Sequence, residues 1–262
     1  MIRGEQGLPL ETLDWSCTAA GRAPGEGEVD VWWIDSHSDR YRDERFFACL
    51  SDEEQERAGR FRFERDRRSY RVSHACKRYI LSRYVDADPA ELQFSLGEWG
   101  KPGLRGSGTD GGWQFNLSHS KGVTLVGVSR GFEVGVDVEA WQTEDRMKPI
   151  FQRFSSHSER HSFGELRNLE QASLLTAWWV SKEAFIKAVG RGLSQALSDF
   201  SIQSRNDAAW SVGEVPAMYG SGDDYRLCLI PLAPGHLGAV VGRSPALTLR
   251  GFQFESVWFN SK

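Results

Sequence analysis

Residues 174–197 read LLTAWWVSKEAFIKAVGRGLSQAL, and the interpretation of the chain begins from this stretch. Its apolar residues recur at helical spacing in two neighbouring stripes. The first stripe is Leu174, Trp178, Phe185 and Ala188, and the second is Leu175, Trp179, Ile186 and Val189. This pattern predicts a helix with a broad buried face. Gly190 and Gly192 then end it, because glycine is favoured where the chain leaves helical geometry.

The same stretch carries two charged residues on one side of the predicted helix. Glu183 and Lys187 are four residues apart and therefore project together. One interpretation is a solvated pair that contributes about 0.2–0.5 kcal/mol to helix stability. The other is a functional pair, because these residues lie between two tryptophans and a glycine-rich exit instead of in a run of alternating charge.

A second acidic pair lies on a predicted strand at 132–139, FEVGVDVE. The alternation of a strand puts its three valines on one side and Asp137 and Glu139 on the other. Two carboxylates on one strand face repel each other unless they are solvated or bridged by a cation. Oxygen ligands without Cys or His suit Mg²⁺ or Mn²⁺. The alternative is an exposed strand edge with ordinary surface acids.

Composition places the chain among ordinary globular proteins. Its 262 residues suit one large domain or two smaller ones, with 40% hydrophobic and 26% charged residues. A net charge of −4 argues against nucleic-acid binding by bulk charge. Four cysteines are scattered without CxxC spacing: Cys17, Cys49, Cys76 and Cys228. With no signal peptide and no bilayer-spanning run, we expect a reduced, cytoplasmic protein that uses no membrane and no zinc.

The order of elements predicts an extension and two halves. Residues 1–28 lack periodicity and are predicted to be a loosely held N-terminal extension. The turn at 129–131 divides a first half, 29–130, from a second half, 131–262. We predict strands at 29–34, 113–119, 123–129, 132–139, 199–202, 225–230, 238–242 and 247–249, with a long helix in each half. Arginines crowd the helix of the first half, either as a solvated face or as a basic rim for a phosphorylated ligand.

Taken together, the motifs resemble the Sfp-type 4′-phosphopantetheinyl transferases over roughly residues 29–250. The motifs are NLSHS (116–120), GVDVE (135–139), WVSKEAFIKAVGRGLS (179–194), EWGKP (98–102) and LSDEEQERAGRF (50–61). The resemblance implies an α+β fold of two similar subdomains related by a pseudo-twofold, with the active site at their interface. It also suggests a monomer.

The resemblance further implies a reaction. Coenzyme A is the donor, a serine of an acyl, aryl or peptidyl carrier protein is the acceptor, and adenosine 3′,5′-bisphosphate is released. Asp137, Glu139 and Glu183 are expected to hold Mg²⁺, with Mn²⁺ as a substitute. Glu183, directly or through a water, is the expected base for the serine hydroxyl. Lys187 is expected to stabilise or protonate the leaving phosphate. An alternative is a coenzyme A- or carrier-binding protein without catalysis.

The resemblance also assigns residues to coenzyme A. Asp137, through the metal, and Lys187 are expected at the pyrophosphate, with Lys182 beside them. Ser118 and His119 are expected on the 3′-phosphate side. The remaining phosphate contacts are expected from Lys101, Arg65, Arg68 and Arg71. Ser69 departs from the family pattern, because many members carry a basic residue at that position.

Overall fold

The computed structural model describes residues 2–3, 8–15, 22–106, 112–165, 171–205, 209–232 and 235–255. The strands are β1 (Ile2–Arg3), β2 (Pro9–Leu10), β3 (Glu28–Asp35), β4 (Phe94–Leu96), β5 (Pro102–Leu104), β6 (Trp113–Ser120), β7 (Val123–Arg130), β8 (Val134–Ala140), β9 (Ile202–Arg205), β10 (Ala209–Val212), β11 (Arg226–Leu232), β12 (His236–Gly242) and β13 (Thr248–Gln253). The α-helices are α1 (Asp52–Gly59), α2 (Glu64–Val85), α3 (Glu144–Phe154), α4 (His157–Glu165) and α5 (Gln171–Val189).

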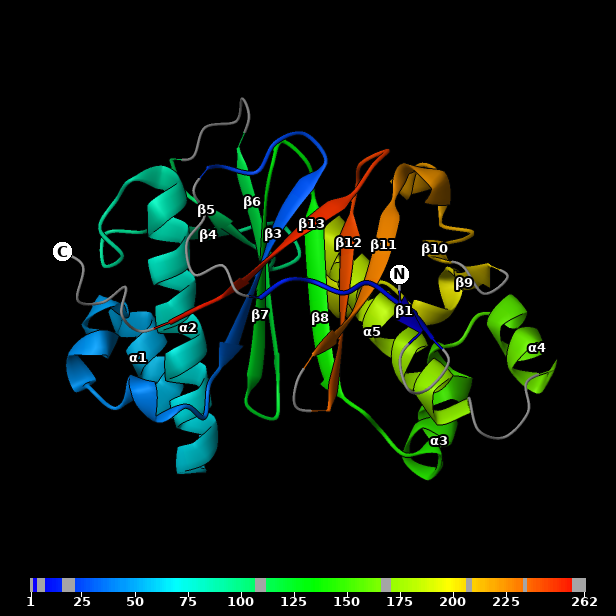
Figure 1. Cartoon of the computed structure of the whole chain (residues 1–262), viewed down its shortest axis with the longest axis horizontal. Helices are drawn as coiled ribbons and strands as arrows, with labels where there is room; N and C mark the ends of the chain where they lie inside the picture. The colour runs from blue at the N-terminus through cyan, green and yellow to red at the C-terminus, as the bar shows by residue number, and fades with distance from the viewer. Residues whose placement is uncertain are drawn as a thin grey trace.

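The two halves repeat one plan, which confirms the predicted α+β fold of two similar parts. Each half runs from a strand through helices and a two-stranded hairpin to two further strands. In each half the strands lie in the order first, third, second, as β3-β7-β6 and as β8-β12-β11. All of these neighbours are antiparallel. Figure 1 shows the first half on the left with α2 and the second on the right with α5.

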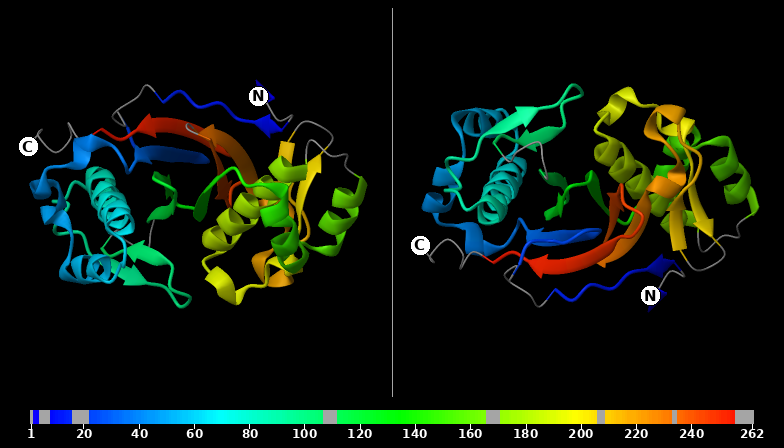
Figure 2. Two further views of the ribbon diagram at one scale, coloured as in Figure 1. Left: turned by 90° about the horizontal axis from the view of Figure 1, so that it is seen from below. Right: turned by 90° about the horizontal axis from the view of Figure 1, so that it is seen from above.

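The sheets of the two halves share an apolar cluster on the faces that point away from α2 and α5. Its valines, leucines and isoleucine come from β3, β7, β8, β11 and β12. Leu13 and Trp15 of the N-terminal segment pack against this cluster. Figure 2 shows that segment lying across the strands on the side opposite the long helices. The N-terminal segment therefore covers the join between the halves.

Helix α5 lies very close to strand β8 at Gly135. A Cβ atom added there would lie 2.1 Å from the carbonyl oxygen of Ala184 and 2.3 Å from the backbone nitrogen of Ala188. Both atoms belong to the backbone of α5, which cannot move aside as a side chain can. Only glycine lets α5 lie this near to β8, and this contact sets the position of the helix over the strand.

Two sequence predictions change in the structure. Residues 1–28 are not a loose extension where the structure describes them, because Leu8 and Leu10 are each only 4% exposed and the N–H of Glu11 bonds to the carbonyl of Leu229 at 2.8 Å. The sequence did not reveal this anchoring, because the apolar residues of the segment lack periodicity.

The predicted strand at 199–202 is wrong, because residues 197–199 form a 3₁₀ turn, η4 (Leu197–Asp199), and β9 begins at Ile202.

The division at residue 130 stays a prediction. β13 is predicted as a strand of the second half, yet it pairs in parallel with β3 and extends the sheet of the first half. Strand pairing therefore crosses the predicted boundary.

None of the helices within the described ranges is long and apolar enough to cross a bilayer.

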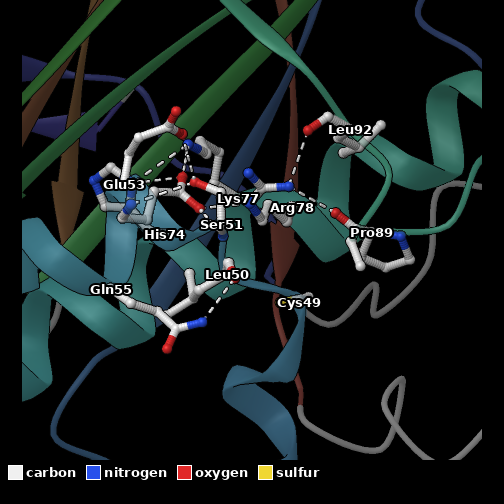
Figure 3. Close-up of polar contacts among 12 residues, drawn as sticks. Cys49, Leu50, Ser51, Glu53, Gln55, His74, Lys77, Arg78, Pro89 and Leu92 are labelled. Carbon is white, nitrogen blue, oxygen red and sulfur yellow. Dashed lines mark hydrogen bonds and ion pairs between the residues drawn. The ribbon is translucent and has the colours of Figure 1, made fainter.

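A buried carboxylate fixes α1 against α2 in the first half. Glu54 accepts hydrogen bonds from Lys77 at 2.8 Å, Arg78 at 2.6 Å and the His74 ring at 3.1 Å. A capping box is present at the start of α1, with Glu54 and Ser51 bonded reciprocally. Figure 3 shows His74, Lys77 and Arg78 of α2 gathered beside Ser51 at the start of α1. One acid thus joins two helices and caps one of them.

The contact at Gly135 leads to a test of stability. We expect Gly135→Ala to lower the free energy of unfolding by about 1–3 kcal/mol, because overpacking a core against fixed backbone is destabilising. Urea unfolding measures this. Gly164→Ala in α4 is the control, since no atom lies within 4 Å of its added Cβ. An unchanged stability of Gly135→Ala would contradict the close contact.

The Glu54 cluster leads to a pH test. Burial lowers the pKa of His74 from 6.5 to about 4, although Glu54 acts in the opposite direction. Between these two values the unfolded chain binds a proton that the folded chain does not. Stability is therefore full above about pH 6.5 and falls as the pH drops towards 4, by up to about 1.4 kcal/mol per pH unit.

We expect His74→Gln to flatten this pH dependence in urea unfolding measured between pH 7 and pH 4. The substitution keeps a hydrogen-bond donor for Glu54 but removes the titrating ring. His157→Gln, at an exposed position in α4, is the matched control and should leave the slope unchanged. Equal slopes for both variants would show that His74 does not carry the effect.

Candidate active site

Side chains, not backbone bonds, join the two halves where β6 meets β8, a contact we call the seam. Alternate residues of β6 face β8. Ser118 donates to Asp137 Oδ1 at 2.7 Å, and Ser120 donates to Glu139 Oε2 at 2.8 Å. Asn116 accepts the backbone N–H of the residue before Asp137 at 3.0 Å. The NLSHS motif therefore holds the two acids of β8 in place.

Helix α5 adds a lysine and a third acid to the seam. Lys187 donates to Asp137 Oδ1 at 2.6 Å and to the Ser118 hydroxyl at 2.9 Å. Glu183, one turn earlier on α5, interacts electrostatically with Asp137, Glu139 and Lys187. This placement follows from Gly135, because Ala184 and Ala188 lie directly against it and carry their neighbours towards Asp137.

Three acids beside one lysine leave the seam with excess negative charge. Burial and, to a smaller extent, the charge of Asp137 raise the pKa of Glu183 to about 7, while Lys187 opposes the rise. Burial also raises the pKa of Glu139, with a smaller contribution from Asp137. Glu183 is thus balanced between its protonated and ionised forms near neutral pH, which suits a group that takes up a proton.

His119 lies on the other face of β6. Its side chain is exposed, yet protein atoms surround it closely enough that burial lowers its pKa. The charges of Lys187 and Arg57 lower that pKa further, and Asp137 acts in the opposite direction. His74 of α2 also interacts with His119. Cationic and imidazole groups of the first half therefore lie near the acids of the second.

The residues present suit a divalent cation. Asp137 Oδ2 is buried and has no hydrogen-bond partner within the described structure, while Oδ1 accepts two bonds. A free carboxylate oxygen among like charges is a donor that hard cations prefer. As the side chains stand, no three His, Cys, Asp or Glu residues in the described ranges are gathered closely enough to hold a metal ion. The ammonium of Lys187 lies beside Asp137 Oδ1.

Five of the eleven predicted site residues meet at the seam. Asp137, Ser118 and Lys187 are bonded together, and Glu139 and Glu183 interact with them. Their roles stay predictions.

Lys101 reaches the second half from the hairpin β4–β5. Its ammonium donates to the carbonyls of Ala188 at 2.8 Å and Val134 at 3.1 Å, and burial lowers its pKa to about 8. Lys101 thus joins the end of α5 to the start of β8. Its predicted contact with a phosphate stays a prediction.

The prediction for Lys182 is wrong. Its side chain is fully buried and bonds to Glu159 at 2.9 Å and to the carbonyls of Leu197 and Phe200. Lys182 lies about 140° around the helix from Lys187, so the two cannot face one ligand.

The arginines of α2 make local contacts. Arg65 pairs with Asp66, Arg68 bonds to the carbonyl of Ser38, and Arg71 pairs with Glu44. Their predicted contacts with coenzyme A stay predictions.

Sequence reasoning missed three contributors. Ser120 and Asn116 bond across the seam, and strand alternation with Ser118 could have revealed both. Arg57 of α1 interacts with His119, but no local pattern separates it from the neighbouring arginines.

Comparison with known proteins places the chain in a family. The 4′-phosphopantetheinyl transferase superfamily model matches residues 133–230, and a 4′-phosphopantetheinyl transferase N-terminal model matches residues 37–130. The transferase ffp of Bacillus subtilis is 30% identical over 209 residues, covering 77% of this chain and 86% of its own. Sfp of Bacillus subtilis is 29% identical over 216 residues, covering 81% and 91%. HetI of Nostoc is 29% identical over 168 residues, covering 64% and 71%.

The chain therefore belongs to the 4′-phosphopantetheinyl transferases, enzymes that move the 4′-phosphopantetheine group of coenzyme A to a carrier-protein serine. The resemblance found in the motifs is confirmed. A holo-(acyl-carrier-protein) synthase from Bacillus anthracis, solved in complex with coenzyme A, matches 42% of this chain and 93% of its own at 16% identity and a TM-score of 0.35. That likeness is too slight to carry any argument.

The charges at the seam predict that two substitutions shift the pKa of Glu183 in opposite directions. Lys187→Met should raise the pKa of Glu183 above about 7, because the lysine lowers it, and Asp137→Asn should lower it. Carbon-13 NMR titration of the Glu183 carboxyl in metal-free protein measures both. Lys148→Met, at an exposed position of α3, is the control. Shifts of the same sign in the two seam variants would contradict the arrangement.

Proposed function

We propose that the seam is the centre at which this chain transfers 4′-phosphopantetheine from coenzyme A to a carrier-protein serine. The observation that carries the proposal is the joint placement of Asp137 of β8 with Lys187 and Glu183 of α5, in which Asp137 and Lys187 bond to Ser118 of the other half. Phosphoryl-type transfer depends mainly on positioning and electrostatics. A base, a metal ion and a cationic side chain can therefore suffice.

Asp137, Glu139 and Glu183 would hold Mg²⁺, with Mn²⁺ as a substitute. The unpartnered Oδ2 of Asp137 supports this assignment. When bound, the ion supplies positive charge that neutralises and orients the pyrophosphate of coenzyme A.

Glu183 takes the proton of the attacking serine hydroxyl. The serine oxygen forms a bond to the phosphorus next to pantetheine, and the bond from that phosphorus to the leaving phosphate breaks. Lys187 stabilises the negative charge on the departing adenosine 3′,5′-bisphosphate. The position of Glu183 on α5, one turn before Lys187 and close enough to Asp137 for their charges to interact, supports its role as base.

The first half supplies charge for the anionic donor. His119 and Ser118 lie on opposite faces of one strand, and Arg57 lies near His119. We assign His119 and Ser118 to the 3′-phosphate side of coenzyme A, with Lys101 and the arginines 65, 68 and 71 as further phosphate contacts.

We also propose that the chain acts as a monomer in the cytoplasm. Cys49, Cys76 and Cys228 are buried and free, which supports a reducing compartment.

The proposal is tested by transfer to a carrier protein, read as a mass increase. We expect Asp137→Ala to abolish transfer while the protein stays folded, because a metal oxygen and the partner of Lys187 are lost. Asp137→Asn, which keeps the shape, should fail as well. Removing divalent ions with a chelator should stop the wild type, and Mg²⁺ should restore it.

Asp145→Ala, at an exposed acid in α3, should transfer at the wild-type rate. Full activity of Asp137→Ala would remove the metal assignment. A wild-type protein that modifies none of a panel of fatty-acid, polyketide and peptide carriers would remove the proposed function.

A further inference from the structure

Lys182 uses every hydrogen of its ammonium inside the second half. The three acceptors are Glu159 Oε2 at 2.9 Å, the carbonyl of Leu197 at 2.7 Å and the carbonyl of Phe200 at 2.6 Å. An ammonium has three donors, so none remains for a ligand. Its nitrogen also lies 4.4 Å from the centre of the Phe200 ring. The side chain is fully buried.

Both carboxylate oxygens of Glu159 accept hydrogen bonds as well. Oε1 accepts the backbone N–H of Ile202 at 2.7 Å, and Oε2 accepts the backbone N–H of Ser156 at 2.7 Å as well as Lys182. The Ser156 hydroxyl accepts the N–H of Glu159 in return, which caps α4. The ion pair therefore ties together α4, α5, η4 and the start of β9.

Stability alone does not explain such a pair. Moving two charges out of water is costly, and a well-packed apolar pair of similar size is often as stable or more so. In this ion pair every donor and acceptor has a partner, so only one arrangement of the connected segments satisfies all the bonds. The pair therefore fixes the relative position of those segments, whereas apolar contacts would let them slide past one another.

The geometry that this pair controls is that of α5. At about 100° per residue, Lys182 lies roughly 200° around the helix from Ala184, which packs on Gly135. The helix is thus held on one side by β8 and on the opposite side by the ion pair. Glu183 and Lys187 lie on the arc between these two contacts, at about 100° and 140° from Lys182.

We propose that Glu159 and Lys182 are positioning residues that hold α5 in the rotation and axial position at which Glu183 and Lys187 face Asp137. They touch no substrate. The proposal rests on the proposed function for its kinetic consequence, while its structural consequence can be measured without any reaction.

The test uses Lys182→Met, Glu159→Gln and the double variant. We expect each to lower kcat about 10- to 100-fold, because small displacements of reacting groups have effects of this size. KM for coenzyme A should change less than kcat, because the double variant leaves the phosphate-binding groups of the first half unchanged. The double variant should regain the melting temperature that Lys182→Met loses, since no charge is left unpaired, but not its kcat.

Leu227→Ala is the matched control for destabilisation, because Leu227 is buried in the same core but lies on β11. It should lower the melting temperature while kcat stays near wild type. A double variant that regains wild-type kcat, or a control that loses kcat as Lys182→Met does, would overturn the proposal. If Lys182→Met fails to fold, Glu159→Gln and the double variant decide by the same criteria.

A measurement without substrate separates this proposal from the proposed function. The carbon-13 chemical shift of the Glu183 carboxyl should change in the double variant and stay constant in Leu227→Ala. An unchanged shift in the double variant would overturn the positioning role, whether or not the wild type transfers phosphopantetheine.

Discussion

The distance between α5 and β8 is the constraint on which the arrangement of the site depends. At Gly135 the backbone of α5 occupies the space where any other residue would carry a Cβ. This contact brings Lys187 within 2.6 Å of Asp137, so that an ion pair forms between a helix and a strand. One missing methyl group on β8 thereby sets the geometry of the charges of the second half.

The seam shows how two halves of similar plan make an environment that neither would make alone. The hydroxyls of Ser118 and Ser120 come from the first half, and the acids they bond come from the second. Because the two strands meet through side chains, the carboxylates of the second half lie at the join in direct contact with hydroxyls of the first. Burial between the halves then raises the pKa of Glu183 to about 7.

Strong local signals allowed much of this to be predicted from sequence. Apolar periodicity located α5, and alternation located β6, β7 and β8 with Asp137 facing the site. Pairing between distant segments carries no such signal, so the parallel contact of β13 with β3 was missed. Motif position suggested that Lys182 faces a ligand, but the residue that pairs with it, Glu159, is 23 positions away, and its capping-box spacing from Ser156 does not indicate that pairing. The sequence shows which residues are charged, but the direction in which a charged side chain points depends on a partner that the sequence does not reveal.

The order of strand pairing has a consequence for synthesis of the chain. β3 leaves the ribosome early, but the strand that covers its outer edge, β13, is made more than 200 residues later. The N-terminal segment likewise waits for Leu229 before Glu11 can bond to it. During translation the first half therefore presents an open strand edge, the kind of surface on which nascent chains associate wrongly. Completion of the second half closes that edge, so neither half finishes folding before the other.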